Sequence, residues 1–152
     1  MLPIRKILCP TDFSDPSYRS LSVACEFAEH FCAAICVIHV VAPIPTVAAN
    51  VGPSAFNINT YQYELEKDAK EMLQKVIREK VPESVTASAI VSHGNAAEKI
   101  LDAAAENDGI DLIVIATRGR TRWRNTLFGS VAERVVRLSP IPVLTVSGKP
   151  TA

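Results

Sequence analysis

Arginines occupy every second position from Arg118 to Arg124, in the segment ATRGRTRWRNTLFGS that spans residues 116–130. The segment ends on Gly129 and Ser130, between an apolar, strand-like run and a helical pattern. A helix N-terminus offers unpaired N–H groups and about half a positive charge, which suits it to bind an anion. A glycine lets the anion approach the backbone without a Cβ in the way. The spacing therefore indicates phosphate binding, with a solvated basic loop as the alternative.

Three residues inside this loop suggest further chemistry. Successive N–H groups around Gly119 could form a second anion cradle, and Arg120 could stabilise charge that develops on a phosphate. Trp123 among the arginines resembles a stacking platform for single-stranded nucleic acid. However, the chain has one tryptophan, and its 16 Lys and Arg balance its 16 Asp and Glu. We therefore expect no nucleic-acid partner.

A carboxylate and three histidines complete the groups that could do chemistry. Asp12 follows an apolar run closed by Pro10, so it could face a ligand or cap a turn or helix. His39 lies within an apolar run, which favours a hydrogen-bonded core histidine over a ligand or base. His93 precedes a glycine and could donate a proton, but the sequence pairs nothing with it. His30, at a helix end, would favour the helix dipole.

The four cysteines and the composition indicate where the chain works. Cys9, Cys25, Cys32 and Cys36 lie among apolar residues, and no second Cys/His pair has zinc-site spacing. We expect free thiols that pack as small hydrophobes, since lasting disulfides are rare in the cytosol. No apolar run approaches the roughly 20 residues of a membrane helix, and the N-terminus lacks a secretory pattern. These features predict a cytoplasmic protein with no membrane partner.

Strand-like and helix-like segments alternate along the chain. Apolar runs predict strands at 6–9, 34–41, 84–91, 111–116 and 143–146. Helical periodicity predicts helices near 21–32, 61–80, 97–104 and 130–138. Residues 42–60, with three prolines, predict a long loop that acts as a lid or only a spacer. The alternation predicts one α/β domain over 1–152, with a five-stranded parallel sheet and helices on both faces.

The predicted fold fixes where a ligand would bind. In such sheets ligands lie beyond the carboxyl ends of the strands, where the strand order reverses. The candidate residues therefore follow the first, second and fourth strands, at Thr11 and Asp12, from Val40 onward, and from Ala116 onward.

The C-terminal part of the chain resembles the signature of the universal stress protein family, Gly-x2-Gly-x9-Gly-Ser/Thr, within ATRGRTRWRNTLFGSVAERVVRLSPIPVLTV. The pattern maps to Ala116, Gly119, Gly129 and Ser130. Three other segments resemble the family's first strand with its Asp, its second strand and its third helix: ILCPTDFSDPS, IHVVAP and HGNAAEKIL. The resemblance covers essentially the whole chain.

The resemblance implies a Rossmann-like, adenine nucleotide alpha hydrolase-like fold with strand order 3-2-1-4-5. It also implies a stress-response protein that binds ATP, with or without Mg²⁺, or AMP, and acts as a nucleotide-dependent signalling module. Asp12 would hold the ribose or adenine edge, and the Val40 backbone would read the adenine. The implied binding residues are Pro10, Thr11, Asp12, Val40, Ile115, Ala116, Gly119, Arg120, Gly129, Ser130 and Val131.

Three positions depart from the family's pattern. Ala116 replaces the first glycine, which predicts a tighter fit, while Arg118 stands where the family often has His and Arg122 where it often has a small residue. The added arginines could clamp phosphates, since a guanidinium offers five donors in a fork, or they could fold over an empty site. An interaction protein with an empty pocket therefore stays open as an alternative.

Catalysis is the third alternative. The one Gly-Lys pair, 148–149, is followed by proline and belongs to no Gly-x4-Gly-Lys-Ser/Thr loop. No Cys/His dyad or Ser/His/Asp order is evident. We expect no enzyme, with slow ATP hydrolysis at most; a nucleotidyl- or phosphoryl-transfer enzyme that uses Arg120 or Arg124 is the competing reading.

The last predicted strand should lie at the edge of the sheet. Residues 142–146 are mostly apolar, and an exposed apolar edge tends to pair with another chain. We expect a homodimer through this strand, as the family resemblance also implies.

Overall fold

A computed structural model of the chain describes residues 3–44, 58–106, 109–118 and 128–147. Within these residues one parallel sheet has the strand order β3-β2-β1-β4-β5. Its strands are β1 (Lys6–Pro10), β2 (Ala34–Val41), β3 (Ala87–His93), β4 (Leu112–Ala116) and β5 (Val143–Val146). The predicted α/β fold and its implied strand order are confirmed.

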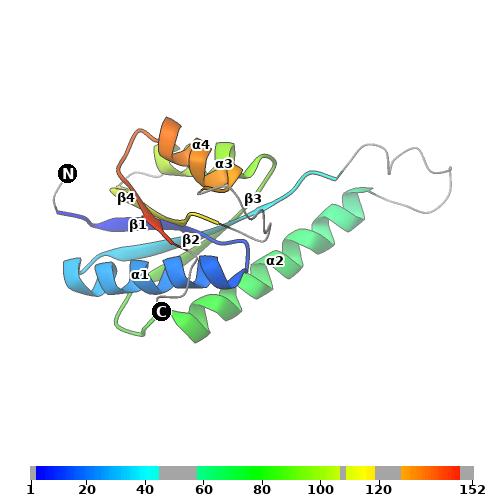
Figure 1. The fold of residues 1–152 in the computed structure, drawn as a ribbon. Coiled ribbons are helices and arrows are strands. Elements are labelled where there is room, and N and C mark those ends of the chain that lie inside the picture. The colour runs from blue at the N-terminus through cyan, green and yellow to red at the C-terminus, as the bar shows by residue number, and fades with distance from the viewer. Residues whose placement is uncertain (1–2, 45–57, 107–108, 119–127, 148–152) are drawn as a thin grey trace.

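Helices cover both faces of the sheet (Figure 1). On one face lie α1 (Asp15–Phe31) and α2 (Ile58–Lys80), and on the other lie α3 (Ala96–Glu106) and α4 (Ser130–Leu138). Each pair encloses its own apolar cluster against the sheet. Leu21 of α1 and Leu73 of α2 belong to one cluster, while Ile100 of α3 and Val135 of α4 belong to the other.

The central strands are buried on both sides because helices lie above and below them. Ile7 and Leu8 are adjacent in β1, face opposite clusters and are both fully buried. Every residue of β4 is buried, which agrees with the continuously apolar pattern of a two-sided strand. The edge strands β3 and β5 are only partly buried. The predicted edge position of the last strand is therefore confirmed.

Three predicted elements have wrong boundaries. The first helix was expected near 21–32, but α1 begins at Asp15, after the N-cap Ser14. The third strand was expected at 84–91, but Val85 donates its amide to Pro82 in a turn, and β3 begins at Ala87. Its pairing with β2 continues to His93, because Val41 of the longer neighbour is still opposite. The second helix begins at Ile58 and not at 61, so 58–60 belong to α2, while 45–57 of the expected 42–60 loop lie outside the described residues.

The cysteines are free thiols, but one prediction about them fails. Cys9, Cys25 and Cys36 are buried, and burial raises the pKa of Cys9 to about 12 and that of Cys25 to about 11. Cys32 was expected to pack as a hydrophobe, yet it is exposed. Cys32 is the C-cap of α1 and has a left-handed backbone conformation, with φ of 54°. Among the described helices, none is both long and apolar enough to cross a membrane.

Candidate functional site

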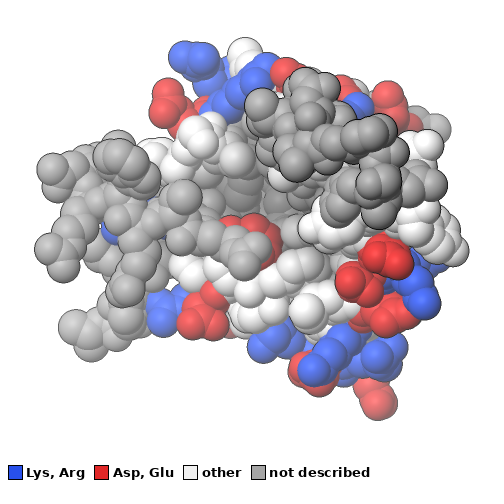
Figure 2. Space-filling model, turned by 90° about the vertical axis from the view of Figure 1, so that its right-hand side faces the viewer, with Lys and Arg blue, Asp and Glu red and all other residues white. Residues whose placement is uncertain are grey.

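A pocket of ≈ 510 Å³ lies where β1, β2 and β4 end, a size common for small-molecule sites. Figure 2 shows this face of the molecule, which is hollowed near its centre. The described surface around the hollow is largely uncharged, apart from acidic atoms within it, and the other charged residues gather toward the upper margin and over the lower and right-hand parts of the view. The strand ends predicted to carry the site thus meet at one pocket.

Most of the predicted site residues line this pocket. Those that do are Pro10, Thr11, Asp12, Val40, Ile115, Ala116, Gly129, Ser130 and Val131. Gly119 and Arg120 lie outside the described residues, as do Arg122, Trp123 and Arg124. The lining also includes residues that the sequence analysis did not assign to a site: Ser17, Ile38, His39, Ala42, Ala96, Ile100, Thr117 and Ala132.

The first wall of the pocket is the turn between β1 and α1, which is held by its own hydroxyl groups. Ser17 Oγ donates to Ser14 O (2.8 Å), so the 2.9 Å contact between Thr11 Oγ1 and Ser17 Oγ has Thr11 as its donor. Thr11 Oγ1 in turn accepts from the Phe13 amide (3.1 Å). Thr11 and Ser17 are both buried. The Thr11 hydroxyl thus donates to Ser17, and the Ser17 hydroxyl donates to Ser14 O, so both hydroxyls have an acceptor.

Asp12 has a structural role in this turn as well as a place in the pocket. Its Oδ1 accepts from the Ser14 amide (3.1 Å) and from the Ser14 hydroxyl. Ser14, and not Asp12, is the N-cap of α1, because its side chain accepts from the Ser17 amide. The alternative that Asp12 is a turn residue is therefore observed, and the same carboxylate lines the pocket.

His39 supports the same turn from the neighbouring strand. Its Nδ1 lies 2.9 Å from the Thr11 carbonyl oxygen, and its ring centroid lies 4.3 Å from that of Phe13. It is half-buried and hydrogen-bonded, as expected of a core histidine, but it also lines the pocket.

The second wall is the N-terminus of α4. Gly129 is the N-cap, without a side-chain cap, and Glu133 donates the first intrahelical hydrogen bond back to it (3.0 Å). The amides of Ser130, Val131 and Ala132 therefore have no acceptor within the helix. Their residues line the pocket, where an anionic group would find these donors.

The amide of Gly129 is bonded within the protein, while the residue itself lines the pocket. Gly129 has an ordinary φ of −72°, and its amide donates to the Thr117 carbonyl oxygen at 2.7 Å. That amide is thus already used, and the available donors begin at Ser130. Thr117 also donates its own amide to Val146 O (2.9 Å), so one residue links the end of β5 to the start of α4.

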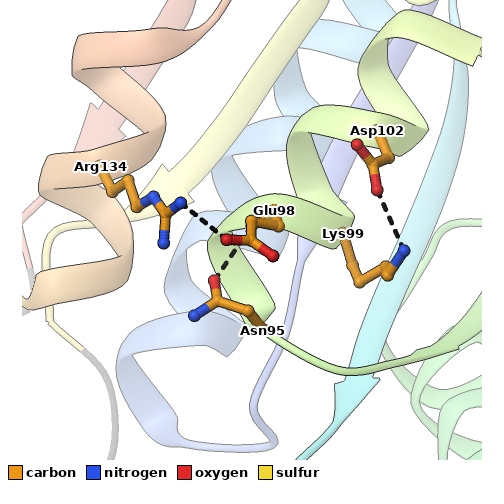
Figure 3. A network of polar contacts seen from close by, with 5 residues as sticks. All are labelled: Asn95, Glu98, Lys99, Asp102 and Arg134. Atoms are coloured by element: carbon orange, nitrogen blue, oxygen red, sulfur yellow. Dashed lines mark hydrogen bonds and ion pairs between the residues drawn. The ribbon is translucent and has the colours of Figure 1, made fainter.

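A third side of the pocket comes from α3, through Ala96 and Ile100. Figure 3 shows the polar contacts that hold this helix. Asn95 Oδ1 accepts from the Glu98 amide (3.2 Å), and Glu98 Oε1 accepts from Arg134 Nη2 of α4 (2.7 Å). The cap and the ion pair fix the first turn of α3 beside α4.

The other two histidines lie away from the pocket lining. The expectation that nothing pairs with His93 is wrong, because its Nε2 lies 2.8 Å from Glu66 Oε1 of α2, a close contact whose angles do not make a hydrogen bond. The two residues lie far apart in the sequence, so no local pattern indicated this contact. His30 is exposed in the last turn of α1, where its ring packs edge-on against Phe31.

Comparison with known proteins places these features in a family. The model of the universal stress protein family matches residues 3–147. The chain belongs to the universal stress protein family. It is 34% identical to universal stress protein MJ0531 of Methanocaldococcus jannaschii over 142 residues, which cover 93% of this chain and 81% of the relative.

Solved universal stress protein structures share the fold. Protein MJ0577 of M. jannaschii superposes with a TM-score of 0.82 at 27% identity, covering 97% of this chain and 99% of that one. A universal stress protein from Archaeoglobus fulgidus in complex with dAMP has a TM-score of 0.61 at 24% identity, covering 95% and 98% of the two chains. A further universal stress protein structure, in complex with cAMP, has a TM-score of 0.61 at 20% identity and covers 96% of this chain and 98% of its own.

Two of the departures from the universal stress protein signature fall within the described residues. Ala116 is the last residue of β4, is buried and lies opposite Val146 of β5. Ala116 is also among the residues that line the pocket. Arg118 also lines the pocket, so its lining contains a guanidinium-bearing residue as well as Asp12.

Proposed function

We propose that this universal stress protein binds an adenine nucleotide, ATP or AMP, in the pocket at the ends of β1, β2 and β4. The observation that carries the proposal is the convergence on one pocket of Asp12 and the amides of Ser130 and Val131, which have no acceptor within α4. The dAMP- and cAMP-bound universal stress proteins support an adenine nucleotide as the ligand class.

The chemistry of the lining suits the two ends of a nucleotide. Ile38, Val40 and Ile100 offer apolar surface to a base, and the Val40 backbone offers polar groups to its edge. At the other end, amide donors and the positive end of the α4 dipole favour phosphate oxygens. Arg118 adds a cationic side chain to the same lining. Asp12 is suited to a ribose hydroxyl, or to a Mg²⁺ ion that accompanies ATP.

We propose a regulatory role and not catalysis. Asp12 is the one carboxylate among the described residues that line the pocket. We therefore expect ATP to be held, with slow hydrolysis at most, so that the bound nucleotide alters how the protein signals in a stress response. Steady ATP turnover by the purified protein, lost in Asp12→Ala, would instead favour the enzyme alternative.

The setting of this role is also a proposal. We infer a homodimer through β5, since that edge strand is partly buried and the adjoining α4 exposes Val136 and Leu138. Free cysteines, three of them buried, suit the reducing cytoplasm. Light scattering at several protein concentrations, with Leu144→Lys as the matched variant, tests the dimer. An unchanged mass for that variant would contradict it.

The most direct test of the function is mass analysis of the nucleotide released when the purified protein is denatured. An adenine nucleotide in near-stoichiometric amount supports the proposal. Calorimetry with ATP and with AMP on protein stripped of ligand then compares the two. No heat with either nucleotide at millimolar concentration would contradict nucleotide binding and favour an interaction protein with an empty pocket.

A further inference from the structure

The turn that carries Asp12 contains a residue in an unfavourable backbone conformation. Phe13 has φ of 63°, in the left-handed region that bulky side chains rarely adopt. Such conformations persist where the surroundings over-determine them, and they cluster at functional sites. Here the Phe13 amide donates to Thr11 Oγ1 (3.1 Å), which satisfies the backbone but gives the ring no support. The ring packs against the apolar cluster of α1 and α2, and it also contacts β2.

His39 contacts both sides of this strained residue. Its Nδ1 lies 2.9 Å from Thr11 O, and a carbonyl oxygen can only accept, so Nδ1 carries the proton. Its ring lies 4.3 Å from the Phe13 ring, tilted by 32°. One side chain thus holds the backbone before Asp12 through a hydrogen bond and the side chain after Asp12 through stacking.

An ordinary core residue would not do this. The neighbours of His39 in β2 are aliphatic from Val37 to Val41, and an aliphatic side chain at 39 could fill similar space. It could not donate to Thr11 O. Position 39 therefore requires a side chain that carries an N–H donor for the Thr11 carbonyl oxygen, and an aliphatic side chain has none.

We propose that His39 is a positioning residue for nucleotide binding. Its Nδ1–H and its ring hold the turn 10–14 in the conformation that presents Thr11 and Asp12 to the pocket. The inference rests on the proposed function, because the turn forms the first wall of that site. His39 acts through Thr11 and Phe13, and the Nδ1–H tautomer is required for this.

The test compares two substitutions of His39 by calorimetry with ATP and with AMP. His39→Asn keeps an N–H donor near the place of Nδ1, whereas His39→Leu keeps the volume and removes the donor. Loss of one neutral hydrogen bond predicts about a fivefold to tenfold weaker affinity for both nucleotides in His39→Leu. We expect His39→Asn to stay within roughly threefold of the wild type. His93→Asn, at the end of the adjacent strand and outside the pocket lining, is the matched histidine control.

Two measurements on the nucleotide-free protein test whether His39 holds the turn 10–14. Nitrogen NMR of the His39 ring should show the Nδ1–H tautomer. Hydrogen exchange of the Phe13 and Ser14 amides should be faster in His39→Leu and restored in His39→Asn. Phe13→Gly, which removes the cost of the left-handed backbone, should show non-additive effects on exchange when combined with His39→Leu.

The outcomes separate this inference from the proposed function. Wild-type affinity in His39→Leu, equal losses in both His39 variants, or an Nε2–H tautomer would each overturn the positioning role while nucleotide binding stands. A wild-type protein that binds neither nucleotide overturns the proposed function and the ligand half of the inference. In that case the tautomer and exchange results still decide whether His39 holds the turn.

Discussion

The two walls of the pocket differ in how far their polar groups are already paired. In the turn between β1 and α1, the hydroxyls of Thr11, Ser14 and Ser17 each donate to another group of the same turn. At the N-terminus of α4, the amides of Ser130 and Val131 have no acceptor inside the helix. The hydroxyls of the first wall are paired within the protein, whereas the second wall has amides without an acceptor in their own helix, here called the spare amides.

This difference assigns the two walls different tasks in binding. A turn fixed before the ligand arrives loses little further entropy on binding, so it sets the shape of the site at low cost. Spare amides can exchange water for a charged phosphate oxygen, and hydrogen bonds to charged groups contribute about 1.5–3 kcal/mol. We therefore expect most of the affinity to come from α4, and the orientation of the ligand to come from the turn.

Removing one spare amide should have the largest effect. Ser130→Pro deletes the N–H at the first helical position, where proline is tolerated. The Gly129 backbone, with φ of −72° and ψ of 156°, suits the residue before a proline. Loss of a charge-assisted hydrogen bond predicts about a tenfold to hundredfold weaker ATP affinity, measured by calorimetry.

Ser130→Ala is the matched control, since it removes the hydroxyl and keeps the amide. If Ser130→Pro and Ser130→Ala bind ATP equally well, the amide does not contact the ligand, and the proposed difference between the walls fails. Thermal denaturation of both variants checks that α4 stays folded.

On the satisfied wall, Asp12→Asn should weaken nucleotide affinity by about tenfold or less, because it removes a charge but keeps the shape of the turn. Asn keeps an oxygen that can accept from the Ser14 amide, as Asp12 Oδ1 does at 3.1 Å. Asp12→Ala loses that acceptor too, so it should also lower the free energy of unfolding by about 1 kcal/mol. Calorimetry and urea denaturation measure the two effects. An Asp12→Ala protein with wild-type stability would mean that the turn does not depend on this carboxylate.

Much of this arrangement could be predicted from the sequence, because strands buried on both faces have continuously apolar patterns. The run at 34–41 gave both bounds of β2, and the apolar run at 143–146 gave those of β5, although this edge strand is only partly buried. The helical period and the Gly-Ser pair gave the bounds of α4, Ser130–Leu138. In a parallel sheet the strand order then brings the ends of β1 and β4 together.

The residues that sequence reasoning missed reach the pocket through tertiary packing. Ser17 and Ala96 lie on helices, and no local pattern says which helical turn faces a strand end. The hydrogen bond from the Gly129 amide to Thr117 was also missed, because Thr117 lies before the loop that connects the two residues. His39 was recognised as a hydrogen-bonded histidine, while its partners on the preceding turn needed coordinates.

The hydroxyl chain of the turn can be broken at one point. Ser17→Ala removes the acceptor of the Thr11 hydroxyl and the donor to Ser14 O. Because Thr11 is buried, its unpaired hydroxyl should lower the free energy of unfolding by about 1–2 kcal/mol. Ser22→Ala is the control, since Ser22 is an exposed serine of α1 whose hydroxyl donates to Tyr18 O at 3.1 Å. Equal urea midpoints for the two variants would mean that the chain adds no stability.

The smallest effect should come from the ion pair between α3 and α4. Glu98 and Arg134 lie 2.7 Å apart, but their side chains are 54% and 40% exposed. A double-mutant cycle with Glu98→Ala and Arg134→Ala should give a coupling free energy of about 0.2–1 kcal/mol, reduced by salt. ATP affinity should hardly change, because the N-terminus of α4 is fixed by the Gly129 amide bonded to Thr117 and by apolar packing, and not by this exposed ion pair. A loss of affinity comparable to that of Ser130→Pro would mean that α3 sets the position of the spare amides, so that the second wall, like the first, depends on side-chain contacts.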